Sequence, residues 1–331
     1  MVTSPGGDTV RIGYLVQARA EWVDQSEGST AQNLFLRHLR LLAGGRVRRT
    51  LTFFIGLDTP NMGKAQSDGT KNNGALGIYD FWITYDPRDA FKLDVGLIGT
   101  PNSHNSIQSI SGMLAPDFSP YSFVSTPPTG AKAGRDYGVE ARGYVLGRHV
   151  EYRAGAFQGY RGPASDHELR YLGRVVIDAY QAERSVYYTG TTLGVRQNLA
   201  LGVSVDHQED YNSVGGDLYV DRPLANGDAV SLQADVVRYD GGRTFQEVPR
   251  QDTWLAEAGY YFKTSRLAPF VQYASQRFAA DSIPDQRQLL GGVAWFIAGH
   301  KLNVKAAVGR SRPSTGRAWT IYQLTMQWFE L

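Results

Sequence analysis

The sequence contains no cysteine, which excludes disulfide frameworks, cysteine-based zinc sites and thiol catalysis. It also lacks any apolar run near the roughly 18 residues that a membrane-spanning helix needs. An excess of charge is missing too: 34 Lys and Arg oppose 32 Asp and Glu among 331 residues, so nothing indicates nucleic-acid binding. Residues 1–9 are polar and lack the apolar core of a secretory signal peptide, so we expect a mature or recombinant form whose export is not read from its start.

Apolar residues recur instead at every second position. Residues 9–22 carry Val, Ile, Tyr, Ala and Trp on one face, with Arg, Gln and Glu opposite. Because successive side chains of a strand point to opposite faces, this alternation predicts a strand with one apolar and one polar face. It is longer than the roughly five or six residues of a typical strand, and long enough to cross a bilayer at a tilt, which takes about ten.

The pattern repeats along the whole chain and predicts sixteen strands. Both ends and the short connections fall on one side and the longer loops on the other, which is the arrangement of a bacterial outer-membrane barrel. Residues 182–198 form a longer connection where a short one is expected, but a further strand at 188–196 would break the even count. The predicted strands are 9–22, 33–42, 47–57, 76–85, 91–97, 137–145, 150–156, 169–180, 199–206, 216–221, 229–239, 253–262, 268–276, 288–297, 301–310 and 318–329, with a tight turn at 43–46 and a loop at 207–213.

Three observations indicate that the apolar faces point outward to lipid. Large aromatic residues stand at the ends of these faces, as a bilayer interface selects. The few charges on them, Arg49, Arg238 and Arg310, lie near strand ends, where long side chains can reach water. A ring of sixteen strands is also too wide for side chains alone to fill. The alternatives are a pair of soluble β-sandwiches or a propeller, but a propeller has a motif repeated in each blade and we find none. The aromatic residues are Trp22, Tyr85, Phe91, Tyr152, Tyr171, Trp254, Tyr260, Phe262, Trp295 and Trp328.

The predicted fold class is therefore all-β: one domain over residues 1–331, a 16-stranded antiparallel transmembrane β-barrel. Residues 100–134 interrupt it with a stretch rich in Ser, Pro and Gly. Structureless loops of this length are usually functional or disordered. As the third long loop, it is predicted to fold into the lumen as a constriction, with the candidate residues His104, Asp117, Tyr121 and Phe123.

The polar face supplies candidate residues for lining a pore and binding anions. One interpretation is a row of guanidinium groups that offers a permeating anion successive weak sites. The loop has little charge, so the wall would then set the sign of the selectivity. The other interpretation is that these residues merely pair with carboxylates on the same face, and both stay open. The candidates are Arg19, Arg48, Lys92, Arg142, Arg153, Arg170, Arg174 and Lys305.

Several segments carry a resemblance to a known family: DFWITYDPRDAFKLD (80–94) and the following 95–101, GRDYGVEARG (134–143), VEYRAGAFQG (150–159), RYLGRV (170–175), YTGTTLG (188–194) and GDLYVDRPLANG (216–227). In order and spacing, the sequence resembles the phosphate-selective porin O and P family of Gram-negative outer membranes. The resemblance implies a sixteen-stranded, usually trimeric porin with its third loop folded inward and basic residues lining the passage.

The function predicted is passive diffusion of small hydrophilic solutes, with anion or phosphate preference as a hypothesis. The expected partners are outer-membrane lipid, small hydrophilic or anionic solutes and two further copies of the chain. An outer-membrane hydrolase and a surface receptor or adhesin stay as alternatives. The six histidines show no metal-ligand spacing, so no metal or cofactor is expected. His104 lies near Ser103 and Ser106, but neighbours in sequence make no triad, and we predict no enzyme.

Overall fold

The computed structural model describes residues 2–4, 7–25, 29–180 and 182–331. Strands account for most of this part of the chain, and the remaining regular elements are four short 3-10 helices. The strands are β1 (Val2–Thr3), β2 (Thr9–Gln25), β3 (Ser29–Val47), β4 (Leu51–Asp58), β5 (Gly77–Arg88), β6 (Phe91–Gly99), β7 (Arg135–Val145), β8 (Val150–Phe157), β9 (Arg170–Asp178), β10 (Asn198–Gln208), β11 (Tyr211–Pro223), β12 (Ala229–Asp240), β13 (Gln251–Tyr261), β14 (Leu267–Phe278), β15 (Gln286–Trp295), β16 (Ile297–His300), β17 (Leu302–Pro313) and β18 (Trp319–Glu330), and the helices are η1 (Asn105–Ile107), η2 (Ile110–Gly112), η3 (Pro127–Thr129) and η4 (Leu146–Arg148).

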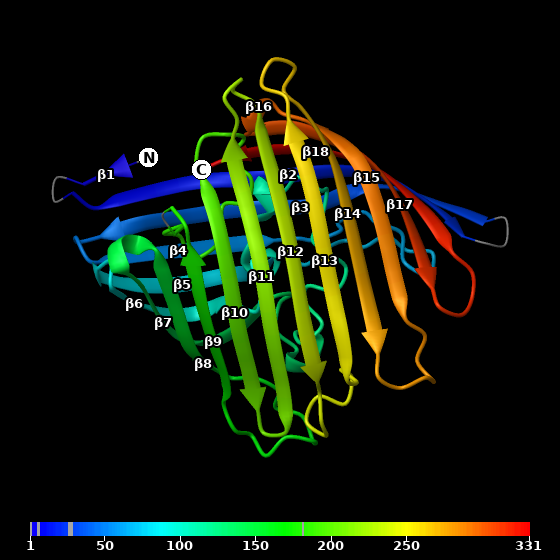
Figure 1. The fold of residues 1–331 in the computed structure, drawn as a ribbon, viewed down its shortest axis with the longest axis horizontal. Helices are drawn as coiled ribbons and strands as arrows, with labels where there is room; N and C mark the ends of the chain where they lie inside the picture. Colours follow the sequence, from blue (N-terminus) through cyan, green and yellow to red (C-terminus); the bar gives the residue numbers. More distant parts are fainter. Residues whose placement is uncertain (1, 5–6, 26–28, 181) are drawn as a thin grey trace.

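One antiparallel sheet closes on itself (Figure 1). Each long strand pairs with the next along the chain, and β18 pairs with β2 to complete the ring, with Tyr322 opposite Trp22. The sheet has 17 strands including the two-residue β1, so sixteen form the barrel. The predicted sixteen-stranded antiparallel barrel is confirmed. Among the described residues, no helix has the length and apolar character to span a membrane.

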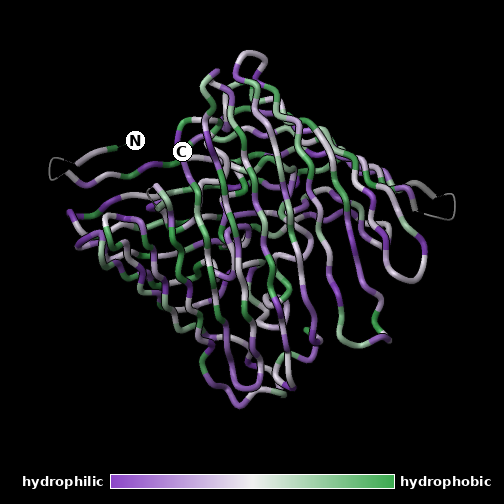
Figure 2. Tube along the Cα trace, in the orientation of Figure 1, coloured by the Kyte–Doolittle hydropathy of each residue, from purple (hydrophilic) through white to green (hydrophobic). Residues whose placement is uncertain are grey.

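The strands alternate in hydropathy along their length (Figure 2). Apolar side chains such as Leu201, Val203 and Trp254 are exposed on the outer surface, while Asp94, Arg142 and Gln17 are buried on the inner one. This is the reverse of a soluble barrel, whose apolar residues fill its interior. The prediction that the polar face points to the lumen therefore holds for these strands.

The predicted turn at residues 43–46 is wrong, because β3 continues to Val47 and the chain reverses over residues 48–50. Gly44 and Gly45 lie in the ladder opposite Phe54 and Phe53. A side chain on Gly45 would collide with the backbone carbonyl of Thr9. The glycine pair therefore permits close packing of neighbouring strands rather than a turn.

The predicted loop at 207–213 is also wrong. Strands β10 and β11 extend until Gln208 lies opposite Tyr211, which leaves a two-residue turn. Glu209 adopts a left-handed backbone conformation there, with φ of 55°. The second turn residue, Asp210, is bonded by a different loop. Its carboxylate accepts hydrogen bonds from the backbone N–H groups of Arg243 and Thr244 at 2.8 and 2.9 Å. Contacts from another loop thus hold this short turn in place.

Candidate functional site

Residues 100–134 lie inside the barrel and contact opposite parts of its wall. On one side, the hydroxyl of Ser204 in β10 donates to the carbonyl of Asn102 at 2.6 Å. On the other, the ammonium of Lys305 in β17 donates to the carbonyls of Met113 and Ala115 at 2.6 and 3.1 Å. The segment thus spans the lumen between distant strands.

Residues 182–197, which belong to the long connection on the side of the short turns, pair with this loop. Tyr188 exchanges two backbone hydrogen bonds with it, donating to Ile107 at 2.9 Å and accepting from Ser109 at 2.7 Å. The backbone N–H of Thr191 donates to the carbonyl of Gly112 at 3.1 Å. Two segments that enter from opposite ends of the barrel therefore meet inside it.

Two large cavities lie beside these segments in the described part of the chain, and Phe118 borders both. The cavity on the side of the long loops has a volume of about 620 Å³ and contacts Asn61, Asp117 and Lys132. The cavity on the side of the short turns has a volume of about 380 Å³ and contacts Trp82, Tyr187 and Phe329. We call them the outer and inner cavities. Both reach the wall formed by β3, β4 and β5, so a passage along this wall would run through both.

A β-bulge aims Arg37 into the outer cavity. Gln17 of β2 lies opposite His38, but the next residue, Ala18, lies opposite Leu36, so Arg37 is the extra residue in β3. A bulge leaves two consecutive side chains free to point the same way, and both Arg37 and His38 line this cavity. The regular alternation places only one of two neighbours in the lumen, which is why sequence reasoning missed Arg37.

A second bulge does the same for Tyr79 in β5. Gly56 of β4 lies opposite Asp80 and Leu57 lies opposite Ile78, which leaves Tyr79 as the extra residue. The ring of Tyr79 lies between two guanidinium groups, with Arg40 at 4.3 Å and Arg135 at 4.0 Å from its centroid. Such cation–π contacts hold both guanidinium planes against the ring. Strict alternation with the outward-facing Phe81 and Ile83 would turn Tyr79 outward, and the bulge turns it inward instead.

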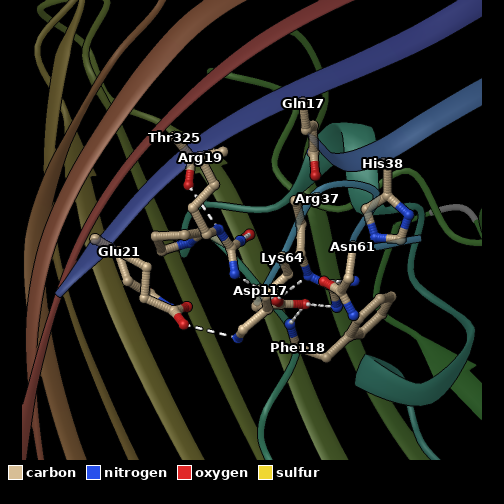
Figure 3. A network of polar contacts seen from close by, with 12 residues as sticks. Gln17, Arg19, Glu21, Arg37, His38, Asn61, Lys64, Asp117, Phe118 and Thr325 are labelled. Atoms are coloured by element: carbon tan, nitrogen blue, oxygen red, sulfur yellow. Dashed lines mark hydrogen bonds and ion pairs between the residues drawn. The ribbon is translucent and has the colours of Figure 1, made fainter. Parts of the chain in front are cut away.

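The carboxylate of Asp117, in the inward loop, is bonded by two arginines of the barrel wall (Figure 3). Its Oδ2 accepts from Arg19 at 3.0 Å and from Arg37 at 2.8 Å, and its Oδ1 accepts from Arg37 at 3.0 Å. Removal from water alone would raise the pKa of Asp117, but the positive charges of Arg37 and Arg19 outweigh this and hold it below the usual range. The carboxylate therefore stays ionised and fastens the loop to β2 and β3.

The structure brings four of the predicted wall residues into one row. Lys92, Arg142, Arg153 and Arg174 are successive cross-strand partners on β6 to β9. This row follows the circumference of the barrel and not its axis, so it offers no succession of sites along a passage. It borders neither cavity.

Carboxylates neutralise this row. Arg142 bonds Asp94 at 2.6 Å, and both oxygens of Asp217 accept from Arg174 at 2.5 and 2.8 Å. The remaining members pair in the same way: Arg153 with Glu140 and Glu151, Lys92 with Asp86, and, next to the row, Arg170 with Asp206. The guanidinium of Arg153 also donates to backbone carbonyls of residues 185 and 186. These side chains hold the wall and the inward segments together.

The other predicted wall residues differ in their placement. Arg48 is exposed in the turn between β3 and β4, with φ of 57°, so the structure corrects its assignment to the lumen. Its backbone N–H donates to Asp8 at 2.6 Å. Lys305 and Arg19 do point into the lumen, but both are almost fully buried under the loop. Neither lines a cavity.

The predicted loop residues face in three directions. His104 is stacked between Tyr188 and Tyr219, with ring centroids at 4.7 and 3.7 Å. Its ring nitrogens approach Gln233 and Glu183 at 3.2 and 3.5 Å, and no contact with a serine hydroxyl is among them. Of the remaining two, Phe123 borders the outer cavity and Tyr121 faces β12 and β13, where burial raises its pKa to about 12.

The candidates did not include most of the residues that border the cavities, among them Arg37, Tyr79, Lys132 and Arg135. The bulges explain the first two. Arg135 stands at the end of the long loop, where it bonds Asp80 through Nε at 2.7 Å and Nη2 at 3.2 Å. Within the residues that the structure describes, no group of three or more His, Cys, Asp or Glu could hold a metal ion.

Comparison with known proteins agrees with this architecture. The family model described as "Phosphate-selective porin O and P" matches residues 10–281. The chain belongs to this family. It is an outer-membrane porin of the Gram-negative type, and its strands span that membrane. A comparison with curated protein sequences finds no match.

Solved structures with the same fold share little sequence with this porin. An anion-selective porin from Comamonas acidovorans has a TM-score of 0.66 at 11% identity, over 98% of this chain and 100% of that one. The outer-membrane channel DcaP of Acinetobacter baumannii has a TM-score of 0.63 at 14% identity, over 99% of each chain. OmpT of Vibrio cholerae, in a trimer form, has a TM-score of 0.59 at 10% identity, over 98% of this chain and 99% of that one.

Proposed function

We propose that this porin conducts small hydrophilic solutes along the wall formed by β3, β4 and β5, with a modest preference for anions. The observation that supports a preference for anions is the set of charges around the two cavities. Four basic residues border them, against three acidic ones. The basic residues are Arg37, Arg40, Lys132 and Arg135, and the acidic residues are Asp58, Asp80 and Asp117.

Within one barrel domain over residues 1–331, the inward loop acts as the constriction. The loop residues that border the passage include Asp117, Phe118 and Phe123, while Tyr121 and His104 contact other parts of the wall. The planar fork of arginine suits oxyanions such as carboxylate and phosphate. Selectivity thus comes from residues near the bulges and from Lys132 of the loop, and not from the predicted row on β6 to β9.

The porin is proposed to work as a homotrimer embedded in outer-membrane lipid. Support comes from the trimer form of the structurally similar OmpT. The exposed apolar outer surface, which includes Trp254 and Trp328, suits lipid contact at the bilayer interface.

We also propose that the chain performs no covalent chemistry. The hydroxyls of Ser103 and Ser106 bond the backbone of their own turn, and the hydroxyl of Ser103 also bonds the carboxylate of Asp235. His104 is held by Gln233 and two tyrosine rings. An esterase assay on the purified trimer tests this. Hydrolysis that disappears in His104→Ala would overturn it.

The proposed conduction is tested by reversal potentials in planar bilayers under a tenfold gradient of potassium chloride. The sign is expected to be that of a channel more permeable to chloride than to potassium. A cation-preferring reversal potential would contradict the charge assignment, and the absence of channels would contradict the function. Competition between chloride, phosphate and sulfate then ranks the anions.

A further inference from the structure

The inner cavity differs from the lumen of a simple water-filled pore because much of its lining is aromatic or aliphatic. On the barrel wall, the rings of Phe54 and Trp82 are stacked, with centroids 4.5 Å apart and planes inclined by 23°. Tyr187 continues this row, with its ring edge-on to Trp82 at 5.4 Å. Across the cavity stand Ile110 and Phe329. Lumen-facing positions of an outer-membrane barrel are ordinarily polar, so this lining calls for an explanation.

Packing within the barrel explains only part of this apolar lining of the inner cavity. Trp82 is 8% exposed and packs with Ile98, Phe157 and Leu172 beneath the inward segments. Phe54 and Tyr187 are only half-buried, and both border the open space. The ring row therefore presents aromatic surface to any solute in the cavity.

Two guanidinium groups border the same cavity as this row of aromatic rings. Arg40 and Arg135 both border the inner cavity. Arg135 is heavily committed, since it donates to Asp80 twice and to the carbonyl of Ala133 at 2.8 Å. Arg40 donates from Nε to Asp58 at 2.9 Å, and its Nη2 lies 3.5 Å from Nδ1 of His38. The outer edge of Arg40 is thus the better placed of the two to receive a carboxylate.

We propose that the inner cavity binds aromatic monocarboxylates during their passage, with the carboxylate at Arg40 and the ring against Phe54, Trp82 and Tyr187. The volume of about 380 Å³ lies within the range of small-molecule sites. Such sites are mostly apolar with a few placed polar groups, as this one is. This assignment of a solute class rests on the anion-conducting channel proposed above.

The test compares three solutes on single channels carrying chloride current: benzoate, acetate and benzyl alcohol. Benzoate has both the ring and the charge, and each other solute lacks one of them. Because offset or edge-on ring contacts add to simple burial, benzoate is expected to reduce the current at a roughly three- to tenfold lower concentration than acetate. Benzyl alcohol is expected to leave the current unchanged. Equal potency of benzoate and acetate would overturn the proposal.

Two variants locate the effect. Phe54→Leu and Trp82→Leu keep an apolar side chain but remove aromatic surface, and each is expected to bring the potency of benzoate toward that of acetate. Trp254→Leu removes an aromatic residue from the outer surface and serves as the matched control. Phe54 is half-buried at the cavity edge, so its variant decides the test if Trp82→Leu does not fold. A benzoate preference that persists in Phe54→Leu would refute the proposed site.

The result of the benzoate experiment is independent of the reversal potentials that test the proposed function. Reversal potentials in potassium chloride involve no aromatic solute and report only the charge preference. An anion-preferring channel that treats benzoate like acetate would refute the aromatic site alone. A cation-preferring channel would refute the proposed function whatever benzoate does.

Discussion

Asp117→Asn separates the charge of the constriction from its shape. Asparagine keeps the size of the side chain and one accepting oxygen, but removes the negative charge held by Arg19 and Arg37. The charges bordering the cavities change from four basic and three acidic to four basic and two acidic. The variant is therefore expected to prefer anions more strongly than the wild type.

The size of the effect follows from Coulomb's law. At about 6 Å from a permeating ion and with water between, one unit charge is worth about 0.7 kcal/mol. That energy changes the local population of an ion about threefold, since about 1.4 kcal/mol corresponds to a factor of ten. Without the negative charge, the local population of anions rises and that of cations falls by about this factor. The ratio of anion to cation permeability is therefore expected to rise roughly tenfold. Salt screening shrinks the change at high ionic strength, because the Debye length falls to about 3 Å at 1 M.

Reversal potentials in dilute and concentrated potassium chloride measure this ratio. Asp68→Asn is the matched control, because Asp68 is exposed in the loop between β4 and β5 and borders neither cavity. A loop released from the wall would change the conductance of both ions together, whereas the lost charge changes their ratio. An unchanged ratio at low salt, or one shifted toward cations, would refute the reasoning.

Three further outcomes are expected. The lowered pKa of Asp117 means that its bonds persist at every pH above 3.8, the ordinary value for aspartate, and are lost only below it. The difference in permeability ratio between wild type and Asp117→Asn should therefore be equal at pH 7 and pH ~4.5, and a difference that shrinks at the lower pH would contradict the anchoring role. Arg174→Gln leaves the buried carboxylate of Asp217 unpaired and should destabilise the barrel by about 3–5 kcal/mol, seen as a lower thermal midpoint in detergent, while the selectivity of channels that form stays that of the wild type. Gly112→Ala would push a methyl group into the backbone carbonyl of Thr189, and the resulting strain of about 1–3 kcal/mol should produce noisier single-channel currents, whereas quiet currents would show that the two segments separate without cost.

The barrel could be predicted from the sequence because alternation is local and repeats in every strand. Pairing between charges could not be predicted, because it depends on the register of strands and on contacts across the lumen. Arg142 meets Asp94 only because β6 and β7 align in one particular register. Arg174 reaches past its neighbouring strand to Asp217 in β11. The hypothesis of a row of free guanidinium groups failed mainly at this step, and the assignment of faces failed for Arg48.

The bulge in β3 left a readable trace in the sequence. Leu34 and Leu36 occupy even positions, whereas Leu39 and Leu41 occupy odd ones, so the outward phase moves by one residue between them. Such a change of phase requires an extra residue, and the structure places it at Arg37.

The bulge in β5 shows the same signature. Ile78 faces outward at an even position, and Phe81 and Ile83 face outward at odd ones, with Tyr79 as the extra residue. Each change of phase turns one more side chain inward than strict alternation allows. The bulge in β3 adds Arg37 to the lumen. The bulge in β5 adds Tyr79, whose ring contacts the guanidinium groups of Arg40 and Arg135. The irregularities of the strand pattern thus mark the wall that borders both cavities, and a search for breaks of phase would have located this wall before the structure did.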